Sequence, residues 1–169
     1  MSPTWRDLAA GKRRQQLESI PKDWIITVPG EDVLDVTGVP STCWPLLSTR
    51  ELEITETEDV DILLGKLAAA EWSAVEVTTA FCKRAVVAHQ LVSQLLRCPL
   101  VQPTDYDMHW QVNCLTEIFI DRALARAAEL DEHLRTTGAP VGPLHGLPVS
   151  LKDQFDVKGI ETTIGLSIS

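Results

Sequence analysis

The sequence has 169 residues, of which 44% are hydrophobic and 23% are charged, a composition typical of a folded chain rather than a disordered one. With 15 Lys and Arg against 24 Asp and Glu, its formal net charge is −9. A field of that sign repels phosphate groups, so nucleic acid and anionic membranes are not expected partners. No apolar run reaches the roughly 18 residues that a membrane span requires.

The N-terminal residues and the cysteines indicate a compartment. Residues 1–7 contain no apolar stretch of the kind that forms a secretory signal. The cysteines at positions 43, 82, 98 and 114 match neither a zinc-site spacing nor a Cys-x-x-Cys motif. We therefore expect reduced thiols, no metal site and a cytoplasmic location.

Two regions of different character open the chain. Residues 1–20 have apolar side chains close to helical spacing, which predicts a short helix that ends at Pro21. Residues 22–50 contain several Pro and Gly residues and predict an extended, turn-rich arm around a larger body. The sequence therefore divides into a helix and arm over 1–50 and a domain over 51–169.

Three helices are predicted in the domain. Thr55 and Glu58 fit a capping box at the start of the first helix, and Ser73 and Glu76 fit a second box. These two helices would form a helical hairpin. The third runs from about residue 121 to a Gly stop at 138, and its apolar residues recur at helical spacing.

The stretch 92–111 interrupts this pattern. Pro99 and Pro103 forbid a continued helix, and a structureless insert of this length is uncommon inside a compact domain. Removing the stretch would join the second helix directly to the region before the third. Its two ends can encode splice-site consensus sequences, so we hypothesise that this atypical insert is an intron read as coding sequence.

The most informative motif follows the third helix. Residues 142–153 read Gly-Pro-Leu-His-Gly-Leu-Pro-Val-Ser-Leu-Lys-Asp, which predicts a rigid turn and then a strand over 147–152. A lysine among apolar neighbours at a strand end can have a lowered pKa and act as a general base. The plainer interpretation is that Lys152 is a surface lysine paired with Asp153. His145 is interpreted as part of the turn or of a pocket lining.

This motif resembles the amidase signature family, in particular its fungal acetamidase-type branch. The family segment Gly-x-Pro-x-x-x-Lys-Asp matches Gly146, Pro148, Lys152 and Asp153. Residues 67–77 are also similar to the helix-turn-helix that precedes the motif in the family, and the likeness covers nearly the whole chain outside 92–111. The resemblance implies an α/β fold: the N-terminal part of the amidase signature fold, with helices packed on an incomplete mixed sheet.

The resemblance also implies a chemistry. The expected function is hydrolysis of the carbon–nitrogen bond of small carboxylic amides by a Ser–cis-Ser–Lys triad, with no metal and no cofactor. Lys152 is then the catalytic lysine. The expected supporting or pocket residues are Gly146, Pro148, Asp153, Thr162 and Thr163. The intact enzyme would take a small amide substrate and could form a homodimer.

The two triad serines do not have recognisable counterparts. In the family they lie in a Gly/Ser-rich segment after the lysine motif, and Ser167 and Ser169 lack that context. The sequence is therefore interpreted as an N-terminal fragment that is inactive alone. Two alternatives stay open: a non-catalytic helical interaction module, and a gene-model remnant of an amidase.

Overall fold

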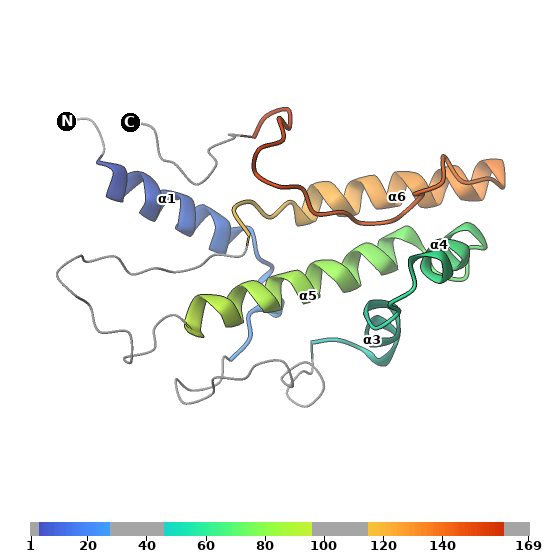
Figure 1. Ribbon diagram of the computed structural model, residues 1–169, viewed down its shortest axis with the longest axis horizontal. Helices are drawn as coiled ribbons and strands as arrows, with labels where there is room; N and C mark the ends of the chain where they lie inside the picture. Colours follow the sequence, from blue (N-terminus) through green and yellow to red (C-terminus); the bar gives the residue numbers. More distant parts are fainter. Residues whose placement is uncertain (1–3, 28–45, 96–114, 161–169) are drawn as a thin grey trace.

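The computed structural model describes residues 4–27, 46–95 and 115–160, and every regular element in these ranges is a helix (Figure 1). The elements are α1 (Trp5–Glu18), the short 3-10 helix η1 (Lys22–Trp24), α3 (Thr49–Thr55), α4 (Val60–Ala68), α5 (Ala74–Leu95) and α6 (Ile120–Thr137). Among the described helices, none has the length and apolarity needed to cross a membrane.

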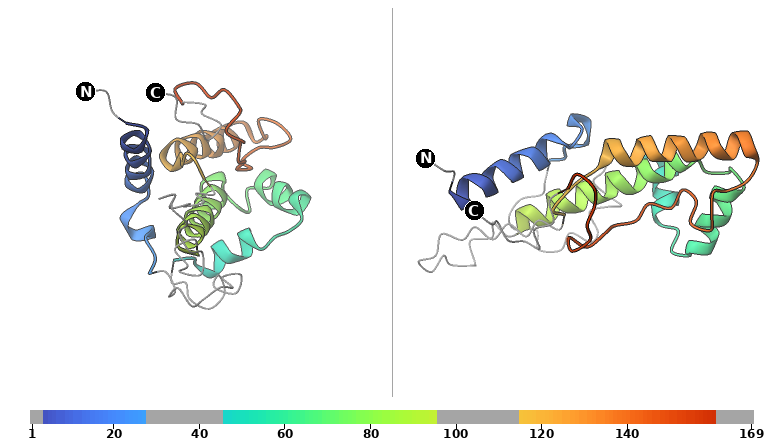
Figure 2. Two further views of the ribbon diagram at one scale, coloured as in Figure 1. Left: turned by 60° about the vertical axis from the view of Figure 1, so that its left-hand side comes forward. Right: turned by 90° about the horizontal axis from the view of Figure 1, so that it is seen from above.

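The long helix α5 is the centre of the arrangement. α6 runs beside it, α3 packs against it, and α4 lies near its N-terminal end (Figures 1 and 2). These four helices share one buried apolar cluster, formed by Ile54, Leu63, Leu67, Trp72, Ala74, Val77, Ala80 and Ala127. Each large apolar side chain buried there contributes about 1.5–3 kcal/mol relative to exposure, so this cluster holds the four helices together.

The two predicted helices are confirmed as α4 and α5, with Trp72 at the connection, but α4 lies across the N-terminal end of α5 rather than alongside it (Figure 1). Trp72 is only 1% exposed. The ammonium of Lys66 lies 4.0 Å from the centre of its ring, and the guanidinium of Arg50 lies 5.3 Å away. Just before it, Ala70 has φ 56°, a left-handed conformation that a non-glycine residue rarely adopts. The connection is therefore tight and locally strained.

The helix starts agree only in part with the predicted capping boxes. The box of Ser73 and Glu76 is confirmed, with hydrogen bonds of 2.9 and 3.0 Å in the two directions. The box of Thr55 and Glu58 is wrong. Ser48 and Glu51 instead form a box seven residues earlier, at the start of α3, and Thr55 is the last residue of that helix.

The prediction failed at Thr55 because a competing cap lies upstream. The Thr55 hydroxyl donates to the Glu51 carbonyl at 2.9 Å and accepts from Arg84 at 2.8 Å, so it ties α3 to α5. The next helix, α4, begins instead at Asp59, whose carboxylate accepts from the Asp61 N–H at 2.8 Å.

The first and last helices follow the prediction closely. α1 begins with an additional capping box, formed by Thr4 and Asp7, and ends at Glu18, just before the proline. α6 ends at Gly138, whose φ of 70° and N–H bond to the Leu134 carbonyl form the expected glycine stop. The helical pattern and the stop residue were both readable from the sequence.

The arm and the insert lie mostly outside the described residues. Of the arm, residues 28–45 are outside, whereas η1 and the chain after it lie against α5: the Gln90 amide donates to the Trp24 carbonyl and accepts from the Ile26 N–H, both at 3.0 Å. α5 continues to Leu95, so the first residues of the predicted insert extend this helix. The remainder, 96–111, is not described.

The predicted strand over 147–152 is not confirmed in the described part of the chain and stays a prediction. These residues belong to no helix and no sheet, and the described ranges contain no strand. The physical reason is the lack of a partner. A strand is completed by backbone hydrogen bonds to a neighbour, and no described segment supplies them. The expected mixed sheet therefore does not appear in the described residues.

Candidate functional site

The motif segment returns along the α5–α6 pair after the turn at the end of α6 (Figure 1). Its turn is closed by His145, which is buried. The Val141 N–H donates to His145 Nδ1 at 3.2 Å, and the His145 N–H donates to the Gly142 carbonyl at 3.1 Å. His145 is thus part of the turn, one of the two roles expected for it.

Gly146 fixes where the motif segment meets the connection between α4 and α5. It is buried, with φ 77°. A Cβ added there would lie 2.9 Å from Leu67 Cδ2 and 3.1 Å from the Ala74 Cβ. Both the backbone conformation and the close approach therefore require glycine. This contact sets the starting point of the chain that leads to Lys152.

The other predicted site residues differ in their exposure, and two of them lie outside the described residues. Pro148 and Asp153 are half-buried and Lys152 is exposed. All three, with Gly146, line one cavity. Thr162 and Thr163 lie outside the described residues. The catalytic role of Lys152 stays a prediction, as does the supporting role of the other residues.

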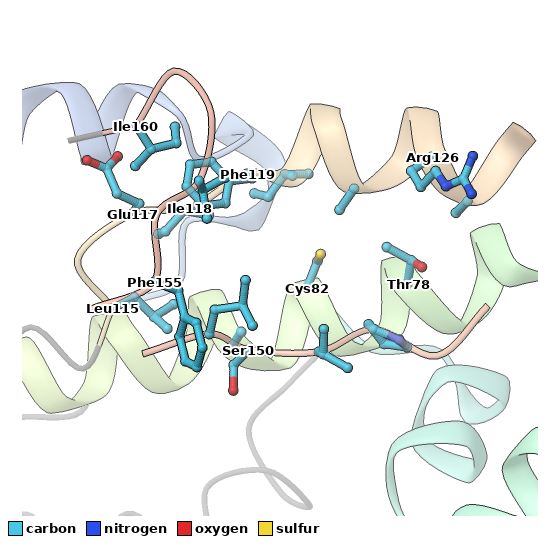
Figure 3. Close-up of a pocket in the computed structure, with 18 of the residues that line it drawn as sticks. Thr78, Cys82, Leu115, Glu117, Ile118, Phe119, Arg126, Ser150, Phe155 and Ile160 are labelled. Atoms are coloured by element: carbon cyan, nitrogen blue, oxygen red, sulfur yellow. The ribbon is translucent and has the colours of Figure 1, made fainter. Parts of the chain in front are cut away.

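The cavity has a volume of about 570 Å³ and lies between α5, α6, the chain before α6 and the motif segment (Figure 3). Most of its lining is apolar. The polar and charged side chains include those of Thr78, Glu117, Arg126, Lys152 and Asp153. In Figure 3, Thr78 and Cys82 project from α5 into the space between the two helices.

Sequence reasoning missed the helical wall of this cavity. Thr78, Cys82 and Ala85 are spaced four and three residues apart and therefore share one face of α5. That spacing could have identified the face. Burial raises the pKa of the Cys82 thiol, which keeps it protonated and unreactive at neutral pH. Cys82 is accordingly a lining residue rather than a nucleophile.

The other wall of the cavity is held by α1, which lies at the far end of the sequence. Lys12 Nζ forms an ion pair with Glu117 Oε1 at 2.6 Å, and the Gln16 amide donates to the Leu115 carbonyl. Leu115 and Glu117 both line the cavity. The N-terminal helix thus positions the chain that enters α6.

Asp131 of α6 fixes the opposite end of the helix pair. Its two carboxylate oxygens accept from the N–H groups of Ala74 and Val75, at 2.6 and 3.0 Å. These N–H groups belong to the first turn of α5 and have no partner within their own helix. A carboxylate from a neighbouring helix therefore caps α5 beside Gly146. Within the described residues, no group of three or more His, Cys, Asp or Glu side chains could hold a metal ion.

Comparison with known proteins identifies the family. The sequence profile described as Amidase matches residues 106–169, the part that contains the motif. An acetamidase from Emericella nidulans is 46% identical over 166 residues, which are 98% of this chain and 26% of the relative. An acetamidase from Aspergillus oryzae is 43% identical over 162 residues, 95% of this chain and 25% of the relative.

A solved structure also matches this chain. Fatty acid amide hydrolase superposes with a TM-score of 0.69 and 32% sequence identity, over 91% of this chain and 24% of that one. The chain thus spans about a quarter of the length of the proteins it matches. By its sequence across nearly its whole length, and by the arrangement of its helices, the chain belongs to the amidase family.

Proposed function

We propose that this chain supplies the catalytic lysine, Lys152, to a site that hydrolyses small carboxylic amides. The observation that supports this most directly is the motif from Gly146 to Asp153, whose buried glycine packs against Leu67 of α4 and Ala74 of α5, in a chain 46% identical to an acetamidase. The two serines of the triad are expected in the part of the relatives that this chain does not match.

In the proposed reaction, a serine oxygen forms a bond to the amide carbonyl carbon. Its proton passes to a bridging serine, whose own proton passes to Lys152 Nζ. The carbon–nitrogen bond then breaks, and the leaving nitrogen takes that proton back along the same path. Water then attacks the acyl carbon, its proton passes along the same path to the serine oxygen, and the ester bond breaks to release the acid and the free serine. Backbone N–H groups would stabilise the oxyanion, and the scheme uses no metal or cofactor.

Further proposals concern the sheet, the N-terminal arm and the state of the intact enzyme. We expect residues 147–152 to become a strand of a mixed sheet once a neighbouring strand is present, with the helices on one face. Residues 1–50 would remain an outer arm around the domain over 51–169. The chain alone is expected to be inactive, because removing triad members leaves little catalysis. The cytoplasmic location and a homodimer of the intact enzyme also stay predictions.

A chimera tests this proposal. The matched quarter of the Emericella nidulans acetamidase is replaced by this chain, and acetamide hydrolysis is measured. We expect activity from the chimera, a loss of at least about a hundredfold in Lys152→Ala, and no comparable loss in Lys158→Ala, an exposed lysine nearby. Equal activity of the two lysine variants would exclude the catalytic role.

The alternative of a non-catalytic interaction module makes a different prediction. A module would fold and bind an amidase without contributing a reacting group. Turnover in a folded chimera would then be insensitive to the residue at 152. The test therefore separates the two functions in one set of proteins.

A further inference from the structure

His145 closes the turn before the lysine motif through one particular ring nitrogen. The Val141 N–H donates to His145 Nδ1 at 3.2 Å, and the His145 side chain is only 6% exposed. Because Nδ1 accepts this hydrogen bond, it carries no proton, and the neutral ring carries its proton on Nε2. The turn therefore requires the neutral form of His145.

This turn sets the direction in which the motif segment leaves the helices. The His145 N–H donates to the Gly142 carbonyl at 3.1 Å. On the other side of the buried glycine, the Leu147 N–H donates to the Leu144 carbonyl at 3.2 Å. Leu147 also packs against the apolar cluster that the four helices share. The course of the chain is thus fixed immediately before it reaches Lys152.

A protonated His145 ring has no stabilising partner in this place. Its Nε2 is buried without an acceptor, and within the described ranges no carboxylate forms an ion pair with the ring. The charged side chains of the helices around the turn bind other groups: Lys66 pairs with Glu53, Glu76 accepts from the Ser73 N–H, Asp131 caps α5, and Glu132 pairs with Arg135.

Protonation also sets two donors against each other. An N–H on Nδ1 would point at the Val141 N–H, so the hydrogen bond between them would be lost. A buried charge without a partner is costly, and the imidazolium is therefore better accommodated in water. The charged ring would leave its place, and the turn would open.

We infer that neutral His145 is a positioning residue for Lys152, and that acid opens the turn and displaces Lys152 from the amidase site. This inference rests on the proposed function. An ordinary imidazole titrates near pH 6.5, roughly, whereas carboxylates titrate about two units lower. The hydrogen bond from Val141 is therefore present at neutral pH and lost as the pH falls through the range in which His145 takes up a proton.

Two deprotonations are then required for activity. Lys152 must be neutral to accept a proton, and His145 must be neutral to hold the turn. Each requirement lowers kcat/KM by about tenfold per pH unit below the titration of its own group. The logarithm of kcat/KM should therefore fall with a slope of about one while Lys152 alone is protonated, and of about two below roughly pH 6.

The acetamidase chimera tests this pH dependence. His145→Asn places an oxygen acceptor where Nδ1 lies, and this acceptor does not titrate. It should keep kcat/KM at about pH 8 within roughly threefold and show a slope of about one throughout. His145→Ala lacks an acceptor and should lose at least about tenfold at the same pH.

A matched control removes a different imidazole. His133 is half-buried on α6 and takes no part in the turn. The chimera with His133→Asn should keep the slope of about two. Circular dichroism at each pH, and recovery of activity on return to about pH 8, distinguish opening of the turn from unfolding.

Amide hydrogen exchange follows the turn without any catalysis. In the full 169-residue chain, the Val141 N–H is protected while it donates to His145. Its protection, corrected for the intrinsic effect of pH, should fall at least about fivefold between roughly pH 7.5 and 5.5. In His145→Asn the protection should stay constant across this range.

Each other result decides against one part of the account. A slope of about two in His145→Asn overturns the inference, as does a Val141 N–H that is unprotected at neutral pH or equally protected at both pH values. Undiminished activity of Lys152→Ala refutes the proposed function instead. Exchange at Val141 would then still show whether His145 opens the turn.

Discussion

Substituting Gly146 by alanine should destabilise the fold strongly. The φ of 77° costs a non-glycine residue about 1–2 kcal/mol. The new Cβ would lie 2.9 Å from Leu67 Cδ2 and 3.1 Å from the Ala74 Cβ, inside a packed cluster where overpacking costs about 1–3 kcal/mol. Gly146→Ala should therefore lower the free energy of unfolding by about 2–5 kcal/mol.

Two other glycines separate the conformational cost of Gly146→Ala from its packing cost. Gly159 has φ 84° but nothing within 4 Å of an added Cβ, so Gly159→Ala should show only the conformational cost, about 1–2 kcal/mol. Gly142 has neither constraint, and Gly142→Ala should be close to neutral. Urea unfolding followed by circular dichroism measures all three. A Gly146→Ala loss no larger than that of Gly159→Ala would refute the argument from packing.

Three further predictions concern the helices. Asp131→Ala should cost about 1–3 kcal/mol in urea unfolding, since it leaves two N–H groups of α5 without their cap, and Asp131→Asn should cost less; equal losses would contradict this. Ala70→Gly should stabilise the protein by about 1 kcal/mol, because glycine tolerates its φ of 56°; a lower melting temperature would contradict it. The pKa of Glu51 is lowered from 4.5: burial acts to raise it and is the largest single influence, but hydrogen bonds from Lys83 and Ser48 together outweigh it. A lowered folded-state pKa contributes stability that is present above pH 4.5 and lost as pH falls through the folded value. Glu51→Gln should therefore unfold more easily than wild type at pH 7, with the difference shrinking below pH 4.5; a constant difference would contradict the linkage.

The helices could be predicted from the sequence because the signals that start and end them are local. Ser73 with Glu76, and the glycine at 138, act within one turn of chain, so their effect could be predicted without the rest of the molecule. The same logic failed at Thr55 because Ser48 and Glu51 offered an equally good box earlier. Competition between two local signals is resolved by packing, here by the bond from Arg84 to Thr55.

The site was less accessible to prediction because its parts meet only in three dimensions. The motif identified Gly146 and Lys152, but the reason for Gly146 is contact with Leu67 and Ala74, far earlier in the chain. The cap by Asp131 and the α1 contacts of the cavity wall likewise join distant segments. The strand over 147–152 depends on a partner that the described residues do not contain.

The central claim is that Lys152 moves a proton during amide hydrolysis, and the chimera with Lys152→Arg tests it most directly. Arginine keeps the positive charge but stays protonated at any pH an enzyme meets, so it cannot accept a proton. The account predicts that acetamide hydrolysis falls at least about a hundredfold, as in Lys152→Ala. Arginine restoring activity to near the level of the unmodified chimera would contradict it and leave Lys152 as a surface cation.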